Sequence, residues 1–359
     1  MPSLFDPIEL GAIRAANRVF MAPLTRMRAD GDHVPTAMMV DYYRQRASAG
    51  LIISEATGIS RQGLGWPFTP GLYTDAQVEA WKPVTEAVHE AGGKIMAQLW
   101  HQGRLARPDV NQLQPLSASA TRASYHDPDK NPYGEARAAT VAEIKEAVEQ
   151  YAQAARNALA AGFDGVQLHG ANGYLIDQFL RDKTNLRDDD YGGSPENRIR
   201  FMKEAVEAVI AVAGAERTSI RLSPNGETQG ADDSNPEAVF VPAAKLLDEL
   251  GIAFLELREL SPDGTYGATD VPKLSPKIRK VFSRPLVLNQ DYTLEKAQAD
   301  LDSGVADAIA FGRPYIGNPD LMERLRDGVP LSQDNPKTWY SKGPEGYTDY
   351  PPHENQAAA

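Results

Sequence analysis

Short apolar runs rich in β-forming residues recur along the chain, and a stretch with helical spacing follows each of them. Eight runs have this pattern: 18–22, 51–54, 94–99, 165–169, 219–222, 253–257, 285–289 and 306–311. In 141–161, Ala, Ile, Val and Leu recur three and four positions apart, which predicts a helix ending at Gly162. Strands that alternate with helices require a parallel sheet, and eight such units predict an α/β fold, the closed (β/α)8 or TIM barrel.

An open, doubly wound sheet is the alternative architecture, but no Gly-x-Gly-x-x-Gly motif opens a first strand–helix turn. We therefore expect a single TIM-barrel domain over residues 1–359, with loop insertions at the carboxyl-terminal face of the barrel. Residues 1–16 are a lead-in, and 107–134 have the composition of an inserted excursion. Residues 344–359 form a tail whose end we expect to be disordered.

Composition and charge exclude several classes of function. The chain has 49 acidic and 37 basic residues, a net charge of −12, which disfavours nucleic-acid and anionic membrane partners. Neither a long apolar span nor a secretory signal is visible, so we expect a cytoplasmic protein. The absence of cysteine excludes disulfides, thiolate nucleophiles and iron–sulfur clusters. Redox chemistry would therefore need an organic cofactor.

The segment His169-Gly-Ala-Asn172-Gly-Tyr174 follows one of the predicted strands and carries the most chemistry. His169 and Asn172 offer N–H donors suited to an oxygen that gains negative charge, and the Tyr174 phenol is a weak acid that can release a proton. A structural histidine capping a strand end is the alternative interpretation. Polar residues at the other strand ends favour the catalytic interpretation over the structural one, because barrel enzymes build their sites at the carboxyl ends of the strands.

Two groups of strand-end residues predict a mononucleotide ligand. Phe311-Gly312-Arg313, with the turn 289–291, is similar to the phosphate sites after strands seven and eight of many barrels. Arg221 lies within an apolar strand and needs an anion or strong acceptor, or else a carboxylate such as Glu55 or Glu256. Gln98 can pair with a planar heterocycle or be a satisfied core amide. A predicted phosphate site, the cation of Arg221 and the amide of Gln98 together favour a flavin as the ligand.

On these residues the chain resembles the Old Yellow Enzyme family, and its bacterial N-ethylmaleimide, nitrate-ester and 2-cyclohexenone reductases in particular. The resemblance runs from about Leu4 to Tyr350. Its motifs are the following: Met21-Ala-Pro-Leu-Thr-Arg26, His169-Gly-Ala-Asn-Gly-Tyr-Leu175, Phe179-Leu-Arg-Asp182, Asp190-Tyr-Gly-Gly193, Glu196-Asn-Arg198, Phe311-Gly-Arg313 and Gly346-Tyr-Thr-Asp-Tyr350.

The resemblance implies tightly bound, non-covalent FMN. Thr25 would donate to its C4 carbonyl, Arg221 would lie near N1, and Gly312 and Arg313, with backbone near Gln290 and Asp291, would hold the phosphate. The full set of implied cofactor-binding residues is Pro23, Leu24, Thr25, Ala56, Gln98, Arg221, Gln290, Asp291, Gly312 and Arg313. The resemblance also implies that His169 and Asn172 grip the substrate carbonyl, that Tyr174 donates the proton, and that four aromatic residues wall the pocket: Trp66, Trp100, Tyr266 and Tyr347. Many relatives carry a glycine-rich turn at 289–291, so Asp291 must turn away from the phosphate.

The implied function is that of an ene-reductase, using NADPH or NADH to reduce the activated C=C bond of enones, enals, maleimides or nitroalkenes; nitrate esters, which have no C=C bond, would be accepted as a further class of oxidant in the same site. No metal is expected, and the protein would be a monomer or homodimer. Three alternatives remain open. A 2-hydroxy-acid oxidase would need paired arginines near its base, and a lyase or aldolase a lysine at a strand end; the sequence indicates neither. A non-catalytic phosphate-ligand-binding barrel leaves the roles of His169, Asn172 and Tyr174 unexplained.

Overall fold

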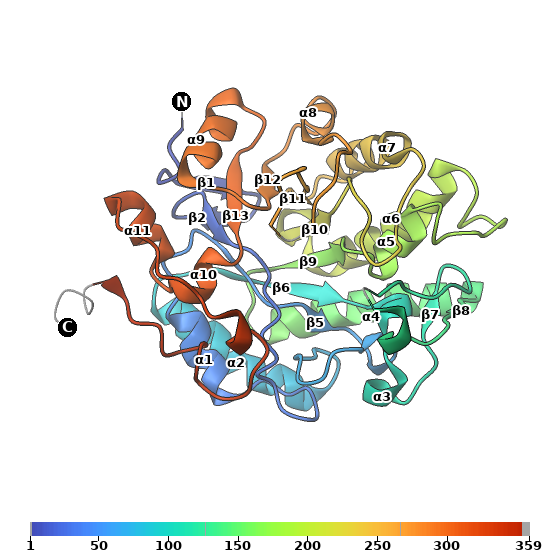
Figure 1. Ribbon diagram of the computed structural model, residues 1–359, viewed down its shortest axis with the longest axis horizontal. Helices are drawn as coiled ribbons and strands as arrows, with labels where there is room; N and C mark the ends of the chain where they lie inside the picture. Colours follow the sequence, from blue (N-terminus) through green and yellow to red (C-terminus); the bar gives the residue numbers. More distant parts are fainter. Residues whose placement is uncertain (1, 126, 266, 354–359) are drawn as a thin grey trace.

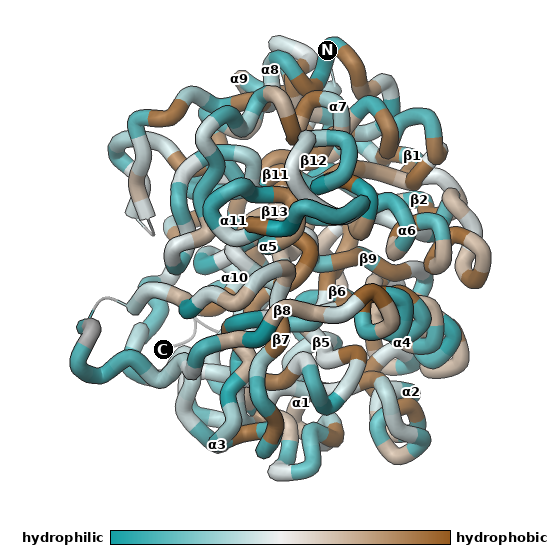
Figure 2. The backbone as a smooth tube through the Cα atoms, turned by 90° about the vertical axis from the view of Figure 1, so that its right-hand side faces the viewer, coloured by the Kyte–Doolittle hydropathy of each residue, from teal (hydrophilic) through white to brown (hydrophobic). Residues whose placement is uncertain are grey.

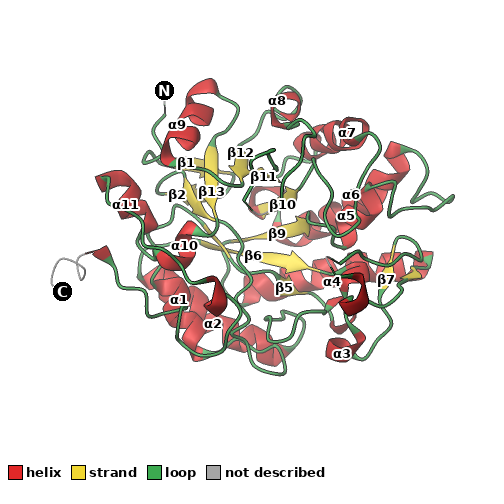
Figure 3. Cartoon of the chain, viewed as in Figure 1, coloured by secondary structure: helices red, strands yellow, loops and turns green. Residues whose placement is uncertain are grey.

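Eight parallel strands close into a barrel in the computed structural model, which describes residues 2–125, 127–265 and 267–353. All eight predicted strands form, so the prediction of a TIM barrel is confirmed (Figures 1 and 3). Each strand pairs with the next, and the last pairs with the first, in this order: β3 (Val19–Met21), β4 (Ile52–Ile53), β6 (Ile95–Trp100), β9 (Gly165–Gly170), β10 (Thr218–Leu222), β11 (Phe254–Arg258), β12 (Leu286–Asn289) and β13 (Ala308–Phe311). A short β5 (Thr57–Gly58) adds to β6.

One helix or more follows each strand, and these helices surround the barrel: α1 (Ala37–Arg44), α2 (Asp75–Glu90), α4 (Val141–Ala160), α6 (Pro195–Ala213), α7 (Pro236–Glu249), α8 (Ser275–Ile278), α9 (Leu294–Ser303) and α11 (Leu321–Asp327). The predicted helix over 141–161 is α4. Thr140 and Glu143 form a capping box at its start, and Gly162, at a φ of 88°, follows its end. Within the described residues, no helix has the length and apolarity needed to cross a membrane.

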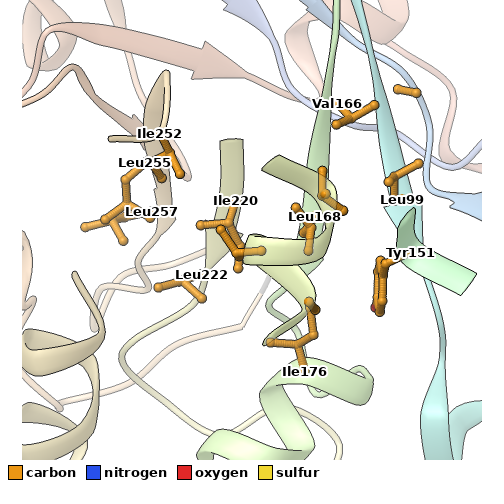
Figure 4. Packing of buried hydrophobic residues seen from close by; sticks show 14 of the residues in the cluster. Leu99, Tyr151, Val166, Leu168, Ile176, Ile220, Leu222, Ile252, Leu255 and Leu257 are labelled. Carbon is orange, nitrogen blue, oxygen red and sulfur yellow. The ribbon is translucent and has the colours of Figure 1, made fainter. Parts of the chain in front are cut away.

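Alternation along the strands separates an outer apolar layer from a polar interior. Leu168, Leu222 and Leu257 belong to the large core that lies between the strands and the helices, and Figure 4 shows side chains of this layer from β9, β10 and β11. Residues one position away, such as Gln167 and Arg221, face the opposite side because successive side chains of a strand alternate. In Figure 2 the hydrophobic stretches gather toward the middle of the molecule and hydrophilic stretches follow its outer helices and loops.

A β-hairpin closes the amino-terminal end of the barrel. The antiparallel strands β1 (Ile8–Leu10) and β2 (Ile13–Ala15) form it, within the segment for which the sequence predicts only a lead-in. Its buried side chains share one apolar cluster with inward residues from the beginnings of the barrel strands, among them Phe20 and Phe254. The Ala12 N–H also donates to the Glu216 carbonyl at 3.0 Å. The bottom of the barrel is therefore filled with apolar side chains.

The insertions lie beyond the carboxyl ends of the strands (Figure 1). After β6 the chain forms α3 (Pro108–Asn111), and then β7 (Leu116–Ser117), which pairs with β8 (Arg137–Ala138). After β9 it forms α5 (Leu175–Leu180), and after β13 it forms α10 (Pro314–Gly317). The expectation that the tail ends in disorder concerns residues 354–359, which lie outside the described part of the chain. These insertions surround the carboxyl-terminal face, where the polar strand ends meet.

Candidate active site

A cavity of about 860 Å³ opens where the carboxyl ends of the strands meet. The structure brings together in its lining almost all of the predicted site residues: Pro23, Leu24, Thr25, Ala56, Trp66, Gln98, Trp100, His169, Asn172, Tyr174, Arg221, Gln290, Asp291, Gly312 and Arg313. They come from segments up to 290 positions apart, from Pro23 to Arg313. Residues predicted from separate strand ends thus share one site, while their individual roles remain predictions.

His169 is held as a neutral N–H donor at the end of β9. Its Nδ1 accepts a hydrogen bond from the Ala171 N–H at 3.3 Å, so the ring proton resides on Nε2. Burial, together with the positive charges of Arg221 and Arg258, holds the pKa of His169 well below its usual range. The ring therefore offers a neutral Nε2–H donor to a partner at neutral pH, and it lacks the second, acidic proton that an imidazolium could transfer.

Asn172 lies in a turn that needs two left-handed residues in succession. Its φ is 59° and that of Gly173 is 75°. A Cβ on Gly173 would come within 2.7 Å of the Thr228 carbonyl oxygen, so a side chain does not fit there. The Asn172 N–H donates to Ser223 Oγ at 2.8 Å, and the Gly173 N–H donates to Asp177 Oδ2 at 2.8 Å. These contacts fix the loop between His169 and α5.

Arg258 orients the Asn172 side chain, and sequence reasoning assigned it no role. Its Nη1 donates to Asn172 Oδ1 at 3.0 Å, and its Nε donates to Gln290 Oε1 at 3.1 Å. Because the amide oxygen is used in this way, the Asn172 NH2 group is the part left for an oxygen in the cavity. A signal was present in the sequence, since Arg258 directly follows the predicted strand 253–257 and barrel enzymes build their sites at the carboxyl ends of strands.

Tyr174 begins α5 and packs edge-on against two rings of the cavity. Its ring centroid lies 5.0 Å from that of Trp100 and 4.8 Å from that of His169, with interplanar angles of 86° and 74°. Edge-to-face packing of this kind is favourable for aromatic pairs. The phenol is therefore held beside the imidazole donor, as a role in proton delivery to the same ligand requires.

Arg221 and Gln98 lie in one connected polar group inside the barrel. Arg221 Nε is 2.9 Å from Glu256 Oε1, although its N–H does not point at the oxygen, so the contact is mainly one of charge. Arg221 Nη2 also donates to Asn289 Oδ1 at 2.5 Å. Of the two carboxylates considered from sequence, Glu256 rather than Glu55 is the partner. Gln98 donates through Nε2 to Gln167 Oε1 at 2.8 Å.

In the turn after β12, Asp291 points toward Arg313. The sequence predicts that this side chain turns away from the phosphate; here it pairs at 2.5 Å with Nη2 of Arg313, the residue expected to hold the phosphate, and it accepts from the Thr265 N–H at 2.8 Å. Burial alone would raise the pKa of Asp291, but hydrogen bonds from Thr265 and Gln290 and the charge of Arg313 outweigh it and lower that pKa. Gln290 and Asp291 also have φ values of 107° and 52°, a conformation that favours glycine.

The residues of the cavity fit FMN. A cation and an amide in its lining, Arg221 and Gln98, match the pyrimidine edge of a flavin, and a second cation in the lining, Arg313, matches a phosphate group. Next to Arg313, a Cβ on Gly312 would meet only the Leu24 side chain, at 3.5 Å, so this backbone is open to close approach. The donor set and the open backbone agree with a mononucleotide.

Tyr347 is not a wall of the cavity, contrary to the expectation. Its ring is fully buried and stacks on Tyr42, with centroids 4.1 Å apart and planes 5° apart. The guanidinium groups of Arg26 and Arg28 lie 5.2 and 4.7 Å from its centroid, and Arg26 Nη2 donates to the Gly346 carbonyl at 2.6 Å. The motif around Tyr347 thus ties the tail to the loop after β3. Tyr266, the other expected wall on a loop, lies outside the described residues.

Among the described residues there is no group of three or more His, Asp or Glu side chains that could hold a metal ion. His101, beside Trp100, is buried, and its Nδ1 accepts from the Gly103 N–H at 3.1 Å. Burial lowers the pKa of His101 to about 3. This histidine stabilises a turn of the chain.

Comparison with known proteins identifies the family. The NADH:flavin oxidoreductase / NADH oxidase family matches residues 3–332. The structure is similar to an Old Yellow Enzyme homologue from Zymomonas mobilis (63% identity, TM-score 0.96, covering 98% of this chain and 99% of that one). It is also similar to morphinone reductase (46% identity, TM-score 0.94, covering 99% and 97%). A probable flavin mononucleotide-dependent alkene reductase of Leishmania infantum is 40% identical over 97% of each chain. The chain therefore belongs to the NADH:flavin oxidoreductase / NADH oxidase family, as a flavin oxidoreductase of the Old Yellow Enzyme type.

Proposed function

We propose that this protein is an NAD(P)H-dependent ene-reductase that reduces the C=C bond of α,β-unsaturated carbonyl compounds. The observation that carries the proposal is the pair of N–H donors, His169 Nε2 and Asn172 Nδ2, each fixed by a hydrogen bond to its other polar atom. When bound, FMN supplies the hydride transfer, from the nicotinamide to the β-carbon of the alkene. The residues of the chain hold the reactants and supply the remaining steps.

Polarisation of the carbonyl is the first of these steps. His169 and Asn172 donate to the substrate oxygen and stabilise the negative charge that develops there as the β-carbon accepts hydride. Because the His169 pKa is lowered, the ring acts as a neutral donor and keeps its proton throughout. Donors fixed before the reaction cost no reorganisation during it, and the loss of one such donor typically costs about 10²–10³ in rate.

Protonation of the α-carbon is the second step. Tyr174 donates the proton, since its phenol is the weak acid that packs against the His169 ring. A neutral imidazole that is already engaged as an oxygen donor cannot take this role. Net addition would be anti if bound FMN supplies hydride to the face of the alkene opposite Tyr174.

The cofactor is held by the residues that the resemblance implies. Thr25 would donate to the flavin C4 carbonyl, Gln98 and Arg221 would pair with the pyrimidine side, and Arg313 would hold the phosphate with backbone from the neighbouring turn. Pro23, Leu24 and Ala56 would contact the ring itself. A cation near N1 favours the reduced, anionic flavin, which suits an enzyme that stores a hydride.

The nicotinamide and the substrate would use the same face of the flavin in turn. A solved structure of morphinone reductase, 46% identical to this chain, is a complex with tetrahydroNAD, which supports a nicotinamide reductant. We propose NADPH or NADH as the donor, and enones, enals, maleimides, nitroalkenes and nitrate esters as acceptors. A carbonyl or nitro oxygen is the shared feature that His169 and Asn172 would grip.

The 2-hydroxy-acid oxidase is the alternative for which the structure matters most. Two arginines, Arg221 and Arg258, do lie near His169, which the sequence did not indicate. Arg221 is engaged by Glu256 and Asn289, however, and Arg258 donates to Asn172 and Gln290. Both guanidinium groups are therefore already engaged by protein acceptors, whereas bidentate binding of a substrate carboxylate requires a pair of parallel N–H donors.

Visible spectroscopy tests the proposal. The purified protein should show flavin absorption, lose it on anaerobic addition of NADPH or NADH, and regain it on addition of 2-cyclohexenone. A colourless protein that cannot be reconstituted with FMN would reject the proposal. Flavin that is bleached by a nicotinamide but reoxidised by no activated alkene would reject the ene-reductase activity while keeping the cofactor.

A further inference from the structure

A chain of hydrogen bonds and charge contacts crosses the barrel interior, and three of its five members line the cavity. Its members point inward from five strands and are all buried: Gln98, Gln167, Arg221, Glu256 and Asn289. Two pairs among them are neighbours in strand register, Gln98 with Gln167 and Arg221 with Glu256. Glu256, in the second pair, accepts from Gln167 of the first and so links the two. It is fully buried, and the mechanism above gives it no role.

The carboxylate of Glu256 fixes the direction of the hydrogen bonds on one side. An ionised carboxylate can only accept, so Gln167 must present its NH2 group, and its Nε2 donates to Glu256 Oε2 at 2.8 Å. The Gln167 oxygen is thereby turned to Gln98, which must also donate, through Nε2 at 2.8 Å. The part of the Gln98 amide left for the cavity is its acceptor oxygen. A flavin pyrimidine ring presents one N–H donor, at N3, that such an oxygen would match.

On the other side, Glu256 compensates the charge of Arg221. The 2.9 Å contact between Glu256 Oε1 and Arg221 Nε places a full negative charge against the guanidinium in a water-poor interior. Asn289 Oδ1 takes a further hydrogen bond from Arg221, and Asn289 Nδ2 donates to the Ala310 carbonyl at 2.6 Å. The guanidinium is thus held in place by neighbours that lie on both of its sides, and its net field toward the cavity is reduced.

We propose that Glu256 is a positioning residue of the flavin site, which orients the Gln98 amide through Gln167 and offsets the charge of Arg221. This inference rests on the proposed function, because it assumes that Gln98 and Arg221 border the flavin. The consequence is a reduction potential lower than Arg221 alone would give, since part of the cation that favours the anionic reduced flavin is neutralised. Glu256 does not line the cavity, so in this proposal it acts only through its neighbours.

The test is Glu256→Gln, which keeps the size of the side chain and removes its charge. Holoenzyme of the wild type and of the variant would be reduced anaerobically in the presence of a redox dye of known potential. We expect the ratio of reduced to oxidised flavin at a given dye potential to rise about tenfold in the variant, which corresponds to about 30 mV for a two-electron couple. FMN affinity should fall as well, because an amide in place of the carboxylate can donate as well as accept and no longer dictates the direction of the Gln98 amide.

Glu259→Gln is the matched control. Glu259 is also buried, but its Oε1 accepts from the Leu274 and Ser275 N–H groups, away from the cavity lining. Its substitution should leave the reduction potential unchanged. An unchanged potential in Glu256→Gln, or an equal shift in both variants, would overturn the inference.

Glu256→Asp separates the effect of the negative charge from that of the length of the side chain. It also provides the test if Glu256→Gln does not fold. The shorter carboxylate keeps the charge but cannot contact both Gln167 and Arg221, so the potential should stay near that of the wild type while FMN affinity falls. A potential that rises as far in Glu256→Asp as in Glu256→Gln would contradict the charge argument. If wild-type protein binds no FMN, the proposed function itself fails, and that outcome is distinct from a bound flavin whose potential ignores residue 256.

Discussion

Arg258 and Asn172 are joined by a hydrogen bond of 3.0 Å that runs from the guanidinium to the amide oxygen. The bond determines which end of the amide faces the cavity. Without it the carboxamide could present its oxygen to the substrate oxygen, and two acceptors would then repel each other. A residue from β11 thus controls the donor that β9 and its loop provide.

We predict that Arg258→Met lowers kcat/KM for 2-cyclohexenone about tenfold, the equivalent of about 1.4 kcal/mol. The infrared carbonyl stretch of the bound enone should move to higher frequency, because the C=O bond is less polarised. Arg258→Lys should restore part of the effect. In an Asn172→Ala background, Arg258→Met should add little, and full additivity of the two losses would contradict the orienting role.

Tyr174→Phe should separate the two half-reactions. Reduction of the flavin by NADPH should proceed at a rate close to that of the wild type, whereas turnover of the enone should fall about 10²-fold or more, since general acid catalysis typically contributes that much. Stopped-flow absorbance at the flavin band measures both rates separately. Steady-state enone turnover equal to that of the wild type would exclude Tyr174 as the proton donor.

Asp291→Gly should tighten FMN binding about tenfold at low ionic strength. The substitution removes a negative charge from the proposed phosphate site, frees Arg313, and places glycine where φ is 52°. Quenching of FMN fluorescence by apoprotein gives the dissociation constant. Asp291→Asn tests charge alone and should act in the same direction, with a gain that shrinks as salt is added. Weaker binding in both variants would show that Asp291 itself helps to hold the cofactor.

Glu55 predicts a specific dependence of stability on pH. Burial raises its pKa to about 7, although Arg26 and Tyr43 partly oppose the shift. The folded protein therefore binds the proton more tightly than the unfolded chain, and stability is lost as pH rises from about 4.5 to about 7. Relative to the wild type, Glu55→Gln should gain about 3 kcal/mol of unfolding free energy between pH 4.5 and pH 8. Denaturant unfolding at both pH values measures this, and parallel pH profiles would contradict it.

Tyr347 distinguishes a structural role from a binding role. Its hydroxyl has no hydrogen-bond partner within the described residues, so Tyr347→Phe should change stability by less than about 0.5 kcal/mol and leave the KM for enones unchanged. Tyr347→Ala removes a ring stacked on Tyr42 and should cost about 3–5 kcal/mol. Thermal unfolding and steady-state kinetics are the measurements. A raised KM in Tyr347→Phe would return the residue to the pocket wall.

The strands were predictable because a buried parallel strand has a local signature, a short apolar run followed by a helical spacing. The polar residues at strand ends followed, since barrel topology brings them together wherever they stand in the chain. The β1–β2 hairpin was missed because its two antiparallel strands follow each other directly, without the helical spacing that marks the barrel strands.

Side-chain partners were harder to predict than positions. Tyr347 belongs to a motif of the family, but the motif does not say whether its ring lines the cavity or packs in the core. Only the stacking on Tyr42 shows that it packs in the core. In the same way Arg258 was visible at a strand end, while its bond to Asn172 depends on the turn that places Asn172 at a φ of 59°. Asp291 was expected to avoid the phosphate. It pairs with Arg313 through the attraction between opposite charges on two different loops, and the spacing of residues in the sequence does not show which loops lie side by side.

The apolar hairpin fills the amino-terminal end of the barrel, and the cavity opens at the opposite, carboxyl-terminal face. A nicotinamide and an alkene that share this opening would obstruct each other, because the first would have to leave before the second could enter. In the proposed cycle, excess of either reactant should slow turnover, so the fastest rate belongs to a balanced mixture of the two. The exchange of reactants at the opening of the cavity would then limit the turnover rate as much as the chemical steps do.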